Sequence, residues 1–236
     1  MSSRPSSYDD IAPFYDAWSV SVTEDVAFYL AEARRSGGPV VDLGVGTGRI
    51  AIPIAAEGIR VIGIDSSAAM LETCARRAAL AGVDVDLRAG ELDEPPVHEQ
   101  VPLVICPFRS YLHLHTHDER ARAFAAAREL LVPGGRFAFD VFAPSAEDIA
   151  ETHGRWLERE PGIWERAVWD LDSRRLTLTV RGDAGESTMA LAWLEADEWE
   201  ALLEAAGFEL EARFGWFDRS PFRGGEDMIF VAQRSS

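Results

Sequence analysis

Between residues 40 and 142 the chain alternates short apolar runs with longer amphipathic segments, and this alternation restricts the possible folds more than any other feature. Apolar runs of this kind predict strands that are buried on both faces, over 40–43, 61–64, 85–88, 103–106 and 137–142. Helical periodicity covers 49–56 and 68–81, and a capping box of Thr116 and Glu119 begins a third helix that we expect to run to Leu131 and to end at Pro133-Gly134-Gly135. Strands that alternate with helices predict a parallel sheet with right-handed crossovers.

The pattern changes after residue 143. Apolar and polar residues alternate over 176–180 and 189–193, which predicts antiparallel hairpins. A helix over 195–206 is followed by Gly207, and two final strands are expected over 208–217 and 228–232. Before residue 40, residues 8–36 are expected to be helical in two pieces that are broken near 19–21.

Charge and cysteine content narrow the classes of partner. The 236 residues include 23 Lys and Arg against 40 Asp and Glu, a net charge of −17, which argues against nucleic acid and anionic membranes because phosphate binding needs a basic face. Cys74 and Cys106 form no disulfide framework and suit a reducing compartment. With no apolar leader at the start and no apolar run of about 20 residues, we expect a cytoplasmic protein.

A glycine-rich loop follows the first expected strand, with the sequence Asp42-Leu-Gly44-Val-Gly46-Thr-Gly48-Arg49. Glycines let the chain turn sharply and let a ligand approach the main chain, and the helix that follows presents free N–H groups. The dinucleotide template Gly-x-Gly-x-x-Gly fails, because Arg49 stands at its third glycine position. Asp65 ends the second strand, where a carboxylate can accept both ribose hydroxyls; the alternative is that Asp65 only caps the helix that follows Ser66 and Ser67.

With these motifs the sequence resembles the class I S-adenosylmethionine-dependent methyltransferases. The matching segments are Val41-Asp-Leu-Gly-Val-Gly-Thr-Gly48, Gly63-Ile-Asp65-Ser66, Gly90-Glu91-Leu92, Leu130-Leu-Val-Pro-Gly-Gly-Arg-Phe137, Leu202-Leu-Glu-Ala-Ala-Gly-Phe208 and Asp227-Met-Ile-Phe-Val-Ala232. The resemblance implies an α/β, Rossmann-like fold. Its seven-stranded, mostly parallel sheet would have the order 3-2-1-4-5-7-6, with the last strand antiparallel and helices on both faces.

The resemblance also divides the chain into functional parts. A single methyltransferase domain over 1–236 would comprise an N-terminal helical cap (1–36), a cofactor-binding core (37–142), an antiparallel insertion over the acceptor site (143–194) and a C-terminal helix and strand pair (195–236). The cofactor implied is S-adenosyl-L-methionine, and no metal is expected.

The resemblance assigns cofactor contacts by position. Asp42, Gly44, Gly46 and Gly48 would hold the methionine part, Asp65 would bind the ribose, and Ser66 would also belong to the cofactor site. Met70, Glu91, Leu92 and Phe108 would complete the cofactor site, with the first three at the adenine. The family more often has Asp where this chain has Glu91.

The segment after the fourth strand bears on the substrate. Nucleic-acid adenine methyltransferases have Asp/Asn-Pro-Pro-Tyr/Phe there, and cytosine C5 enzymes have Pro-Cys; this chain has Cys106-Pro107, so Cys106 is expected to be a small core residue. The stretch 106–114 resembles the N,N-dimethyltransferases of deoxyamino-sugar biosynthesis. The resemblance implies that His113 and Tyr15 are catalytic, with Tyr15 inside Ile11-Ala-Pro-Phe-Tyr-Asp16. A histidine titrating near 6.5 can accept a proton from an amine or from a hydroxyl, so both acceptors remain open.

Several residues keep two interpretations. His113, His115 and His117 could form a metal site, but the helix cap at Thr116 breaks a shared face, and His115 and His117 are expected at the surface or the cap. Trp156, Trp164, Trp216, Tyr8 and Tyr111 could line an acceptor pocket, although aromatic residues between hairpins more often fill a core. Arg109 could clamp an anion, but a salt bridge is the preferred interpretation.

The function expected from all of these features is methyl transfer to a small-molecule acceptor by a monomer or a homodimer. Two alternatives are a non-catalytic adenosyl- or nucleotide-binding regulatory module and an NAD-dependent oxidoreductase. Arg49 at the third glycine position argues against the oxidoreductase.

Overall fold

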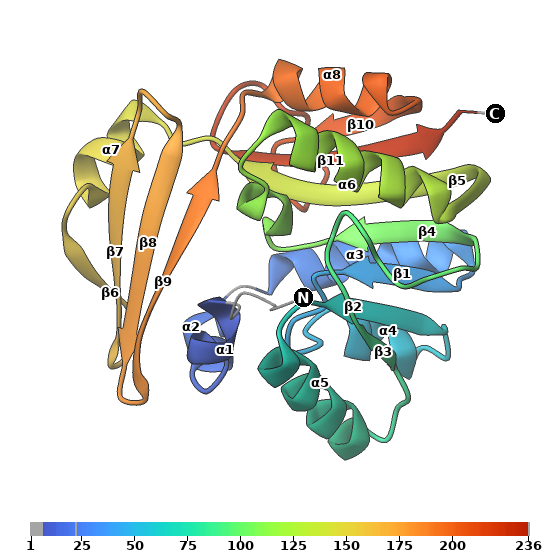
Figure 1. Cartoon of the computed structure of the whole chain (residues 1–236), viewed down its shortest axis with the longest axis horizontal. Helices are drawn as coiled ribbons and strands as arrows, with labels where there is room; N and C mark the ends of the chain where they lie inside the picture. The colour runs from blue at the N-terminus through green and yellow to red at the C-terminus, as the bar shows by residue number, and fades with distance from the viewer. Residues whose placement is uncertain (1–6, 22, 236) are drawn as a thin grey trace.

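The computed structural model describes residues 7–21 and 23–235, and its largest element is a seven-stranded sheet (Figure 1). Its strands follow the order β10-β11-β5-β4-β1-β2-β3. Strand β11 runs antiparallel to both of its neighbours, β5 and β10, and the remaining pairs are parallel. Because β10 and β11 are the sixth and seventh strands of this sheet along the chain, the predicted order 3-2-1-4-5-7-6 is confirmed. The strands are β1 (Val40–Leu43), β2 (Val61–Asp65), β3 (Asp86–Ala89), β4 (Val101–Cys106), β5 (Leu131–Phe142), β10 (Phe208–Phe214) and β11 (Asp227–Arg234).

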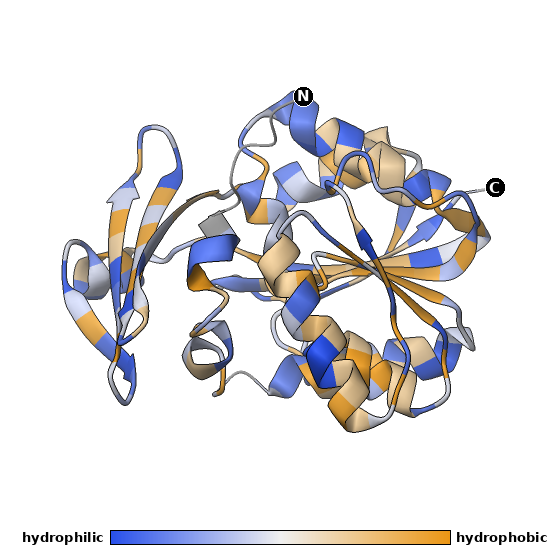
Figure 2. Cartoon of the chain, turned by 60° about the horizontal axis from the view of Figure 1, so that its bottom comes forward, coloured by the Kyte–Doolittle hydropathy of each residue, from blue (hydrophilic) through white to orange (hydrophobic). Residues whose placement is uncertain are grey.

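Helices cover both faces of this sheet. One face packs against α3 (Glu24–Ser36), α4 (Ala51–Ala56) and α5 (Ala68–Ala81), and the other against α6 (His117–Glu129) and α8 (Ala196–Ala205). The central strands are hydrophobic along most of their length, as Figure 2 shows. This continuous burial explains why they have no polar alternation in the sequence.

A second, four-stranded antiparallel sheet lies beside the first, and its strands are all drawn from one stretch of chain (Figure 1). It contains β6 (Trp156–Glu160), β7 (Ile163–Asp170), β8 (Arg175–Gly182) and β9 (Gly185–Ala192), preceded by α7 (Ala146–Thr152). Buried and exposed residues alternate along β7 and β8, so one face of this sheet is apolar. The predicted antiparallel insertion after the fifth strand is confirmed.

The first helices lie between the two sheets. The expected two helical pieces are three in the structure, because α1 (Ser7–Ile11) and α2 (Tyr15–Trp18) precede α3. Helix α1 packs against both α5 and β9, and α2 packs against β6. Residues 1–6 and 22 of the expected cap lie outside the described residues. Among the helices of the described ranges, none is long and apolar enough to cross a bilayer.

The expected end of the helix after Thr116 is wrong. Both halves of the capping box are present at Thr116 and Glu119, but α6 ends at Glu129 and β5 already begins at Leu131. The segment Pro133-Gly134-Gly135 therefore lies inside β5, where Gly134 has φ of 76°. The pairing of β4 with β5 shifts register over this stretch, so the turn residues form a bulge in a strand instead of a break between two elements.

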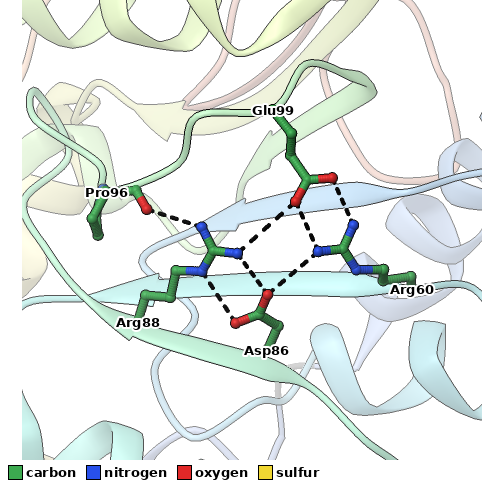
Figure 3. Close-up of polar contacts among 5 residues, drawn as sticks. All are labelled: Arg60, Asp86, Arg88, Pro96 and Glu99. Atoms are coloured by element: carbon green, nitrogen blue, oxygen red, sulfur yellow. Dashed lines mark hydrogen bonds and ion pairs between the residues drawn. The ribbon is translucent and has the colours of Figure 1, made fainter.

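The free edge of the large sheet is occupied by charged residues on and around β3. Arg88 and Asp86 on this strand form an ion network with Arg60 and Glu99 (Figure 3). Arg88 also donates to the carbonyl of Pro96 at 2.9 Å. Charged side chains on an edge strand discourage pairing with another chain. This network therefore disfavours the addition of a further strand beside β3.

Candidate functional site

The glycine loop connects the end of β1 to α4, and its glycines are required by its geometry. Gly44, Gly46 and Gly48 all have left-handed backbones, with φ of 78°, 54° and 83°. A Cβ at Gly44 would lie 2.6 Å from the Ser110 Oγ, and one at Gly48 would lie 2.6 Å from the Cys74 Sγ. Any other residue would therefore strain the backbone at these two positions and collide with a neighbour.

Asp65 joins this loop to the start of α5. One carboxylate oxygen accepts from the Gly46 N–H at 2.8 Å, and the other accepts from the Ser67 N–H at 2.8 Å. The N-cap of α5 is Ser67, so Asp65 holds the N-cap residue in place and does not itself cap the helix. Each oxygen of Asp65 keeps a lone pair for a further donor. Burial raises the pKa of Asp65, and the two backbone hydrogen bonds oppose that rise without cancelling it.

The other residues expected at the cofactor lie close to Asp65. Ser66 is exposed, and Ser67 caps α5 by accepting from the Met70 N–H at 3.2 Å. Met70 is buried. Glu91 is exposed and Leu92 half-buried after β3, and the charge of Glu91 helps to raise the pKa of Asp65.

Asp42, on β1, is a buried carboxyl group with an unsatisfied atom. It is 1% exposed, and its Oδ1 has no hydrogen-bond partner among the described residues. Burial raises the pKa of Asp42 to about 8, the charges of Asp65 and Asp25 add to the rise, and Arg49 opposes it. An acceptor that is buried and unpaired suits a cationic ligand group, because such a partner would remove the cost of burying the charge.

The loop after β4 is held by a residue that the sequence analysis missed. Phe108 and Arg109 have left-handed backbones, with φ of 55° and 63°. Asp140 on β5 accepts from both of their N–H groups, at 2.8 and 3.0 Å, and from the Tyr29 hydroxyl at 2.6 Å. Burial raises the pKa of Asp140 to about 6. The sequence feature that could have identified Asp140 is that it is the one carboxylate within the apolar run 137–142.

Arg49 closes the glycine loop against α3 and the β4 loop. Its guanidinium forms two 2.6 Å bonds with Asp25 and lies 4.8 Å from the centre of the Phe108 ring. The residue that breaks the dinucleotide template is therefore part of a nearly buried ion pair beneath an aromatic ring.

Tyr8, Tyr15, Phe108 and His113 gather between the glycine loop and the second sheet. The Tyr8 hydroxyl lies 2.9 Å from the His113 Nε2, and the Tyr8 ring contacts Tyr15 at a centroid distance of 6.0 Å. Tyr15 in turn contacts Phe108 at 6.1 Å. Of the two predicted catalytic residues, His113 forms a hydrogen bond with Tyr8, and Tyr15 contacts Tyr8 and Phe108 through its ring.

The environment of His113 disfavours its charged form. Burial lowers its pKa to about 4, and His115 contributes to the fall. This value lies below the ordinary histidine value of about 6.5, because burial opposes the charge and no carboxylate among the described residues pairs with the ring to stabilise a proton.

Two carboxylates connect the short N-terminal helices to the glycine loop and to α5. Asp9 accepts from the Ser67 Oγ at 2.6 Å. Asp16 accepts from the Thr47 Oγ1 at 2.6 Å and from Arg77 at 2.7 Å. These bonds connect α1 to the start of α5, and α2 to both the glycine loop and α5.

A cavity of about 480 Å³ lies beside this cluster, lined by residues of both sheets and of the N-terminal helices. That volume is typical of a small-molecule site. Aromatic rings line much of it: Tyr8, Trp18, Phe108, Phe142, Trp169, Trp216 and Phe217. Seven carboxylates, here called the acidic lining, also face it: Glu24, Asp25, Asp140, Asp148, Glu165, Glu226 and Asp227.

The structure separates the aromatic residues considered for a pocket. Tyr8 and Trp216 line the cavity, whereas Trp156, Trp164 and Tyr111 do not. Trp164 is 40% exposed on the outer face of β7, and Tyr111 is buried in the core. Trp18 and Trp169, which were not proposed, do line the cavity. Arg109 lines it as well, and it forms the expected salt bridge, with Asp227 at 2.7 Å.

The three histidines of the His-x-His-x-His segment diverge. His115 bonds through Nε2 to the Ala190 carbonyl at 2.9 Å, while His117 is largely exposed at the start of α6. In the part of the chain that the structure describes, no group of three or more His, Cys, Asp or Glu residues is arranged to hold a metal ion. Cys106 is fully buried, and burial raises the pKa of its thiol.

Comparison with known proteins agrees with this architecture. A family profile described as a methyltransferase domain matches residues 40–135. A protein of Geobacillus sp. (strain WCH70), named as a methyltransferase, is 27% identical over 232 residues, which cover 93% of each chain. The CcbJ methyltransferase of Streptomyces caelestis superposes with a TM-score of 0.85 and 26% identity, covering 99% of this chain and 100% of that one.

Another solved structure shows the same fold at lower identity. The sugar N-methyltransferase KedS8 of Streptoalloteichus sp. covers 100% of this chain and 96% of its own, with a TM-score of 0.72 and 19% identity. The glycine loop, the sheet order with its reversed last strand and these similarities indicate a methyltransferase and argue against an NAD-dependent oxidoreductase or a non-catalytic module. The chain has a methyltransferase domain and the fold of the S-adenosylmethionine-dependent methyltransferases.

Proposed function

We propose that this enzyme transfers a methyl group from S-adenosylmethionine to a small-molecule acceptor held in the 480 Å³ cavity. The observation that carries the proposal is the position of Tyr8. This residue lines the cavity, bonds to His113, and is close enough to Asp65 for the carboxylate charge to help raise the tyrosine pKa. The acceptor cavity and the cofactor edge of the sheet therefore meet at this side chain.

The residues at that edge fit the cofactor chemically. The unpaired Asp42 carboxyl oxygen suits the ammonium of the methionine part, and Asp65 retains lone pairs for ribose hydroxyls. Ser66 lies beside Asp65, and Met70, Glu91 and Leu92 are assigned to the adenine. Phe108 is assigned to the boundary between cofactor and acceptor.

When bound, S-adenosylmethionine supplies a methyl group already activated on a sulfonium, so the protein's task is mainly alignment. Holding two reactants in line can contribute roughly 7–11 kcal/mol. Tyr8, Tyr15 and Phe108 form the aromatic wall on which that alignment would depend. The short bonds from Asp9 and Asp16 fix this wall to the cofactor edge.

His113 is assigned the role of an uncharged hydrogen-bond acceptor at the reacting atom. A proton passed from an ammonium of pKa about 9.5 to a histidine of pKa about 4 costs about 7 kcal/mol. Losing that proton to water at pH 7 costs only about 3.4 kcal/mol. We therefore assign deprotonation of an amine to the solvent, and assign His113 with Tyr8 to orienting the lone pair. Tyr15 remains a candidate catalytic residue through its contact with Tyr8.

A binding measurement tests the cofactor assignment. S-adenosylhomocysteine at a hundredfold excess over its Kd should stabilise the full chain by about 2.7 kcal/mol, and NAD should not stabilise it. Release of S-adenosylhomocysteine from S-adenosylmethionine, followed over a panel of small amines and alcohols, then tests transfer. A thermal shift with NAD but none with S-adenosylhomocysteine would refute the assignment.

A further inference from the structure

From the charges around the cavity we infer that the acceptor is an amine that is cationic in solution and carries no phosphate. This inference rests on the proposed function and narrows the chemical class of its acceptor. The acidic lining contributes seven carboxylates, whereas Arg109 and Arg159 are the guanidinium groups among the described lining residues. Nucleotide-linked sugars carry a diphosphate, so a cavity of this charge disfavours them by like-charge repulsion.

The two guanidinium groups are already engaged. Arg109 pairs with Asp227 at 2.7 Å and lies 4.6 Å from the centre of the Phe142 ring. Arg159 pairs with Glu165 at 3.3 Å. Binding a diphosphate would require these arginines to leave their carboxylates, which would place unpaired negative charges beside the phosphates. Phosphate recognition depends on charge-assisted bonds from Arg or Lys, and the cavity offers no such group in an unpaired state within the described residues.

Four members of the acidic lining form no ion pair among the described residues: Glu24, Asp140, Asp148 and Glu226. Glu24 and Asp140 already accept hydrogen bonds from backbone N–H groups. This leaves Asp148 on α7 and Glu226 just before β11 as the pair considered for a cation. Both side chains are half-buried. Burial raises the pKa of Asp148, the charge of Glu226 adds to that rise, and the charges of Arg159 and Arg109 oppose it without cancelling it. A cation placed near both would offset their mutual repulsion, so these two carboxylates are specificity-determining residues for a positively charged acceptor.

The charge of the methylated product favours nitrogen over oxygen. An amine that has accepted a methyl group is an ammonium until it loses a proton to water, so positive charge is present in the cavity after transfer. A methylated hydroxyl is neutral, and the alkoxide that would precede it is negative. Fixed negative charge stabilises the first case and opposes the second.

The aromatic and aliphatic residues of the cavity indicate which groups the acceptor carries besides its amine. An ammonium over the face of an aromatic ring gains roughly 0.5–2 kcal/mol, and the cavity has several such rings. The inner face of the second sheet adds Ala167, Leu176, Leu178, Met189 and Leu191. An amine attached to an apolar body therefore matches the lining at both of its ends.

Calorimetry on the full chain saturated with S-adenosylhomocysteine tests the inference. The probes are phenethylamine, its neutral analogue 2-phenylethanol, the anion phenylacetate, and thymidine diphosphate. We expect phenethylamine to bind at least tenfold more tightly than 2-phenylethanol, and phenylacetate and thymidine diphosphate to bind more weakly still. Equal affinity for the amine and the alcohol, or tighter binding of thymidine diphosphate than of the amine, would overturn the inference.

Variants connect the preference to Asp148 and Glu226. In the double variant Asp148→Asn with Glu226→Gln, the preference for phenethylamine over 2-phenylethanol should fall about tenfold, which is 1.4 kcal/mol. The matched control is Glu147→Gln, an exposed residue of the same helix that does not line the cavity, and its preference should stay unchanged. An unchanged preference in the double variant contradicts the inference. Failure of S-adenosylhomocysteine to bind in the saturation step instead contradicts the proposed function.

Discussion

Replacing Asp42 by asparagine should stabilise the protein at alkaline pH while weakening its cofactor site. The carboxyl group is 1% exposed, one of its oxygens has no partner, and its pKa is raised from 3.8 to about 8. In the unfolded chain the same group titrates near 4. Between these two values the folded state holds a proton that the unfolded state has lost, so stability falls as pH rises from about 4 to about 8.

The size of the effect follows from the two pKa values. At 1.36 kcal/mol for each pKa unit, the difference corresponds to on the order of 5 kcal/mol. Asparagine keeps the shape and cannot ionise, so wild type and variant should have similar stability at pH 5. By pH 9 the variant should be more stable by several kcal/mol.

Urea unfolding of both proteins from pH 5 to 9, without ligand, measures this difference. Asp84→Asn, at an exposed position, is the matched control and should follow the wild-type curve. The variant should also bind S-adenosylhomocysteine at least tenfold more weakly at pH 8, because an amide cannot pair with the ligand's ammonium. Parallel stability curves for wild type and Asp42→Asn would refute the reasoning.

Three further changes test other parts of the structure. Asp65→Asn should lower the affinity for S-adenosylhomocysteine at least tenfold by calorimetry, since each charge-assisted bond contributes about 1.5–3 kcal/mol; unchanged affinity would leave Asp65 only its structural bonds to Gly46 and Ser67. His113→Leu should lower turnover roughly a hundredfold with cofactor affinity within a few-fold, and the wild-type kcat should show no histidine inflection near pH 6.5, because His113 titrates at about 4. A wild-type inflection there that vanishes in the variant would contradict this assignment. Glu32→Gln should lower the free energy of unfolding by roughly 3 kcal/mol, because the buried Glu32 pairs with Arg136 and Arg219 and its loss leaves a nearly buried guanidinium without full compensation; a thermal shift below about 2 °C would contradict it.

The sequence predicts the parts of the fold that depend on neighbouring residues. The helix over 68–81, with Gly82 after it, and the capping box at Thr116 and Glu119 match the structure because cap and periodicity are local properties. The residues Pro133-Gly134-Gly135 predict a turn, and the structure has this turn as a bulge inside β5 instead of as the end of the preceding helix. A bulge in β5 depends on how that strand pairs with β4, which local sequence does not reveal.

That the glycine loop and Asp65 lie at one edge of the sheet was also predictable from sequence, since the ends of successive parallel strands lie together at that edge. The cavity was not, because its carboxylates come from the N-terminal helices, from β5, from the insertion and from the segment before β11. One lining residue of the cavity was predictable from sequence. Trp164 and Trp169 lie an odd number of positions apart along β7 and so point to opposite faces of the sheet, which means that only one of them can face inward. The buried Ile163 and Ala167 lie on the same face of β7 as Trp169, so Trp169 is the one that faces inward.

The self-contained pairing of the second sheet has an evolutionary consequence. Strands β6 to β9 bond only to one another among the named strands, while β5 continues its pairing with β4 and β11 without them (Figure 1). The chain leaves the large sheet after Phe142, returns to its covering helix α8 at Ala196 and re-enters the sheet at Phe208, so residues 143–195 form a separate inserted segment. Recombination can exchange it for a different acceptor wall without changing a single strand pair on the cofactor side, provided that the few N-terminal residues packed against it change as well.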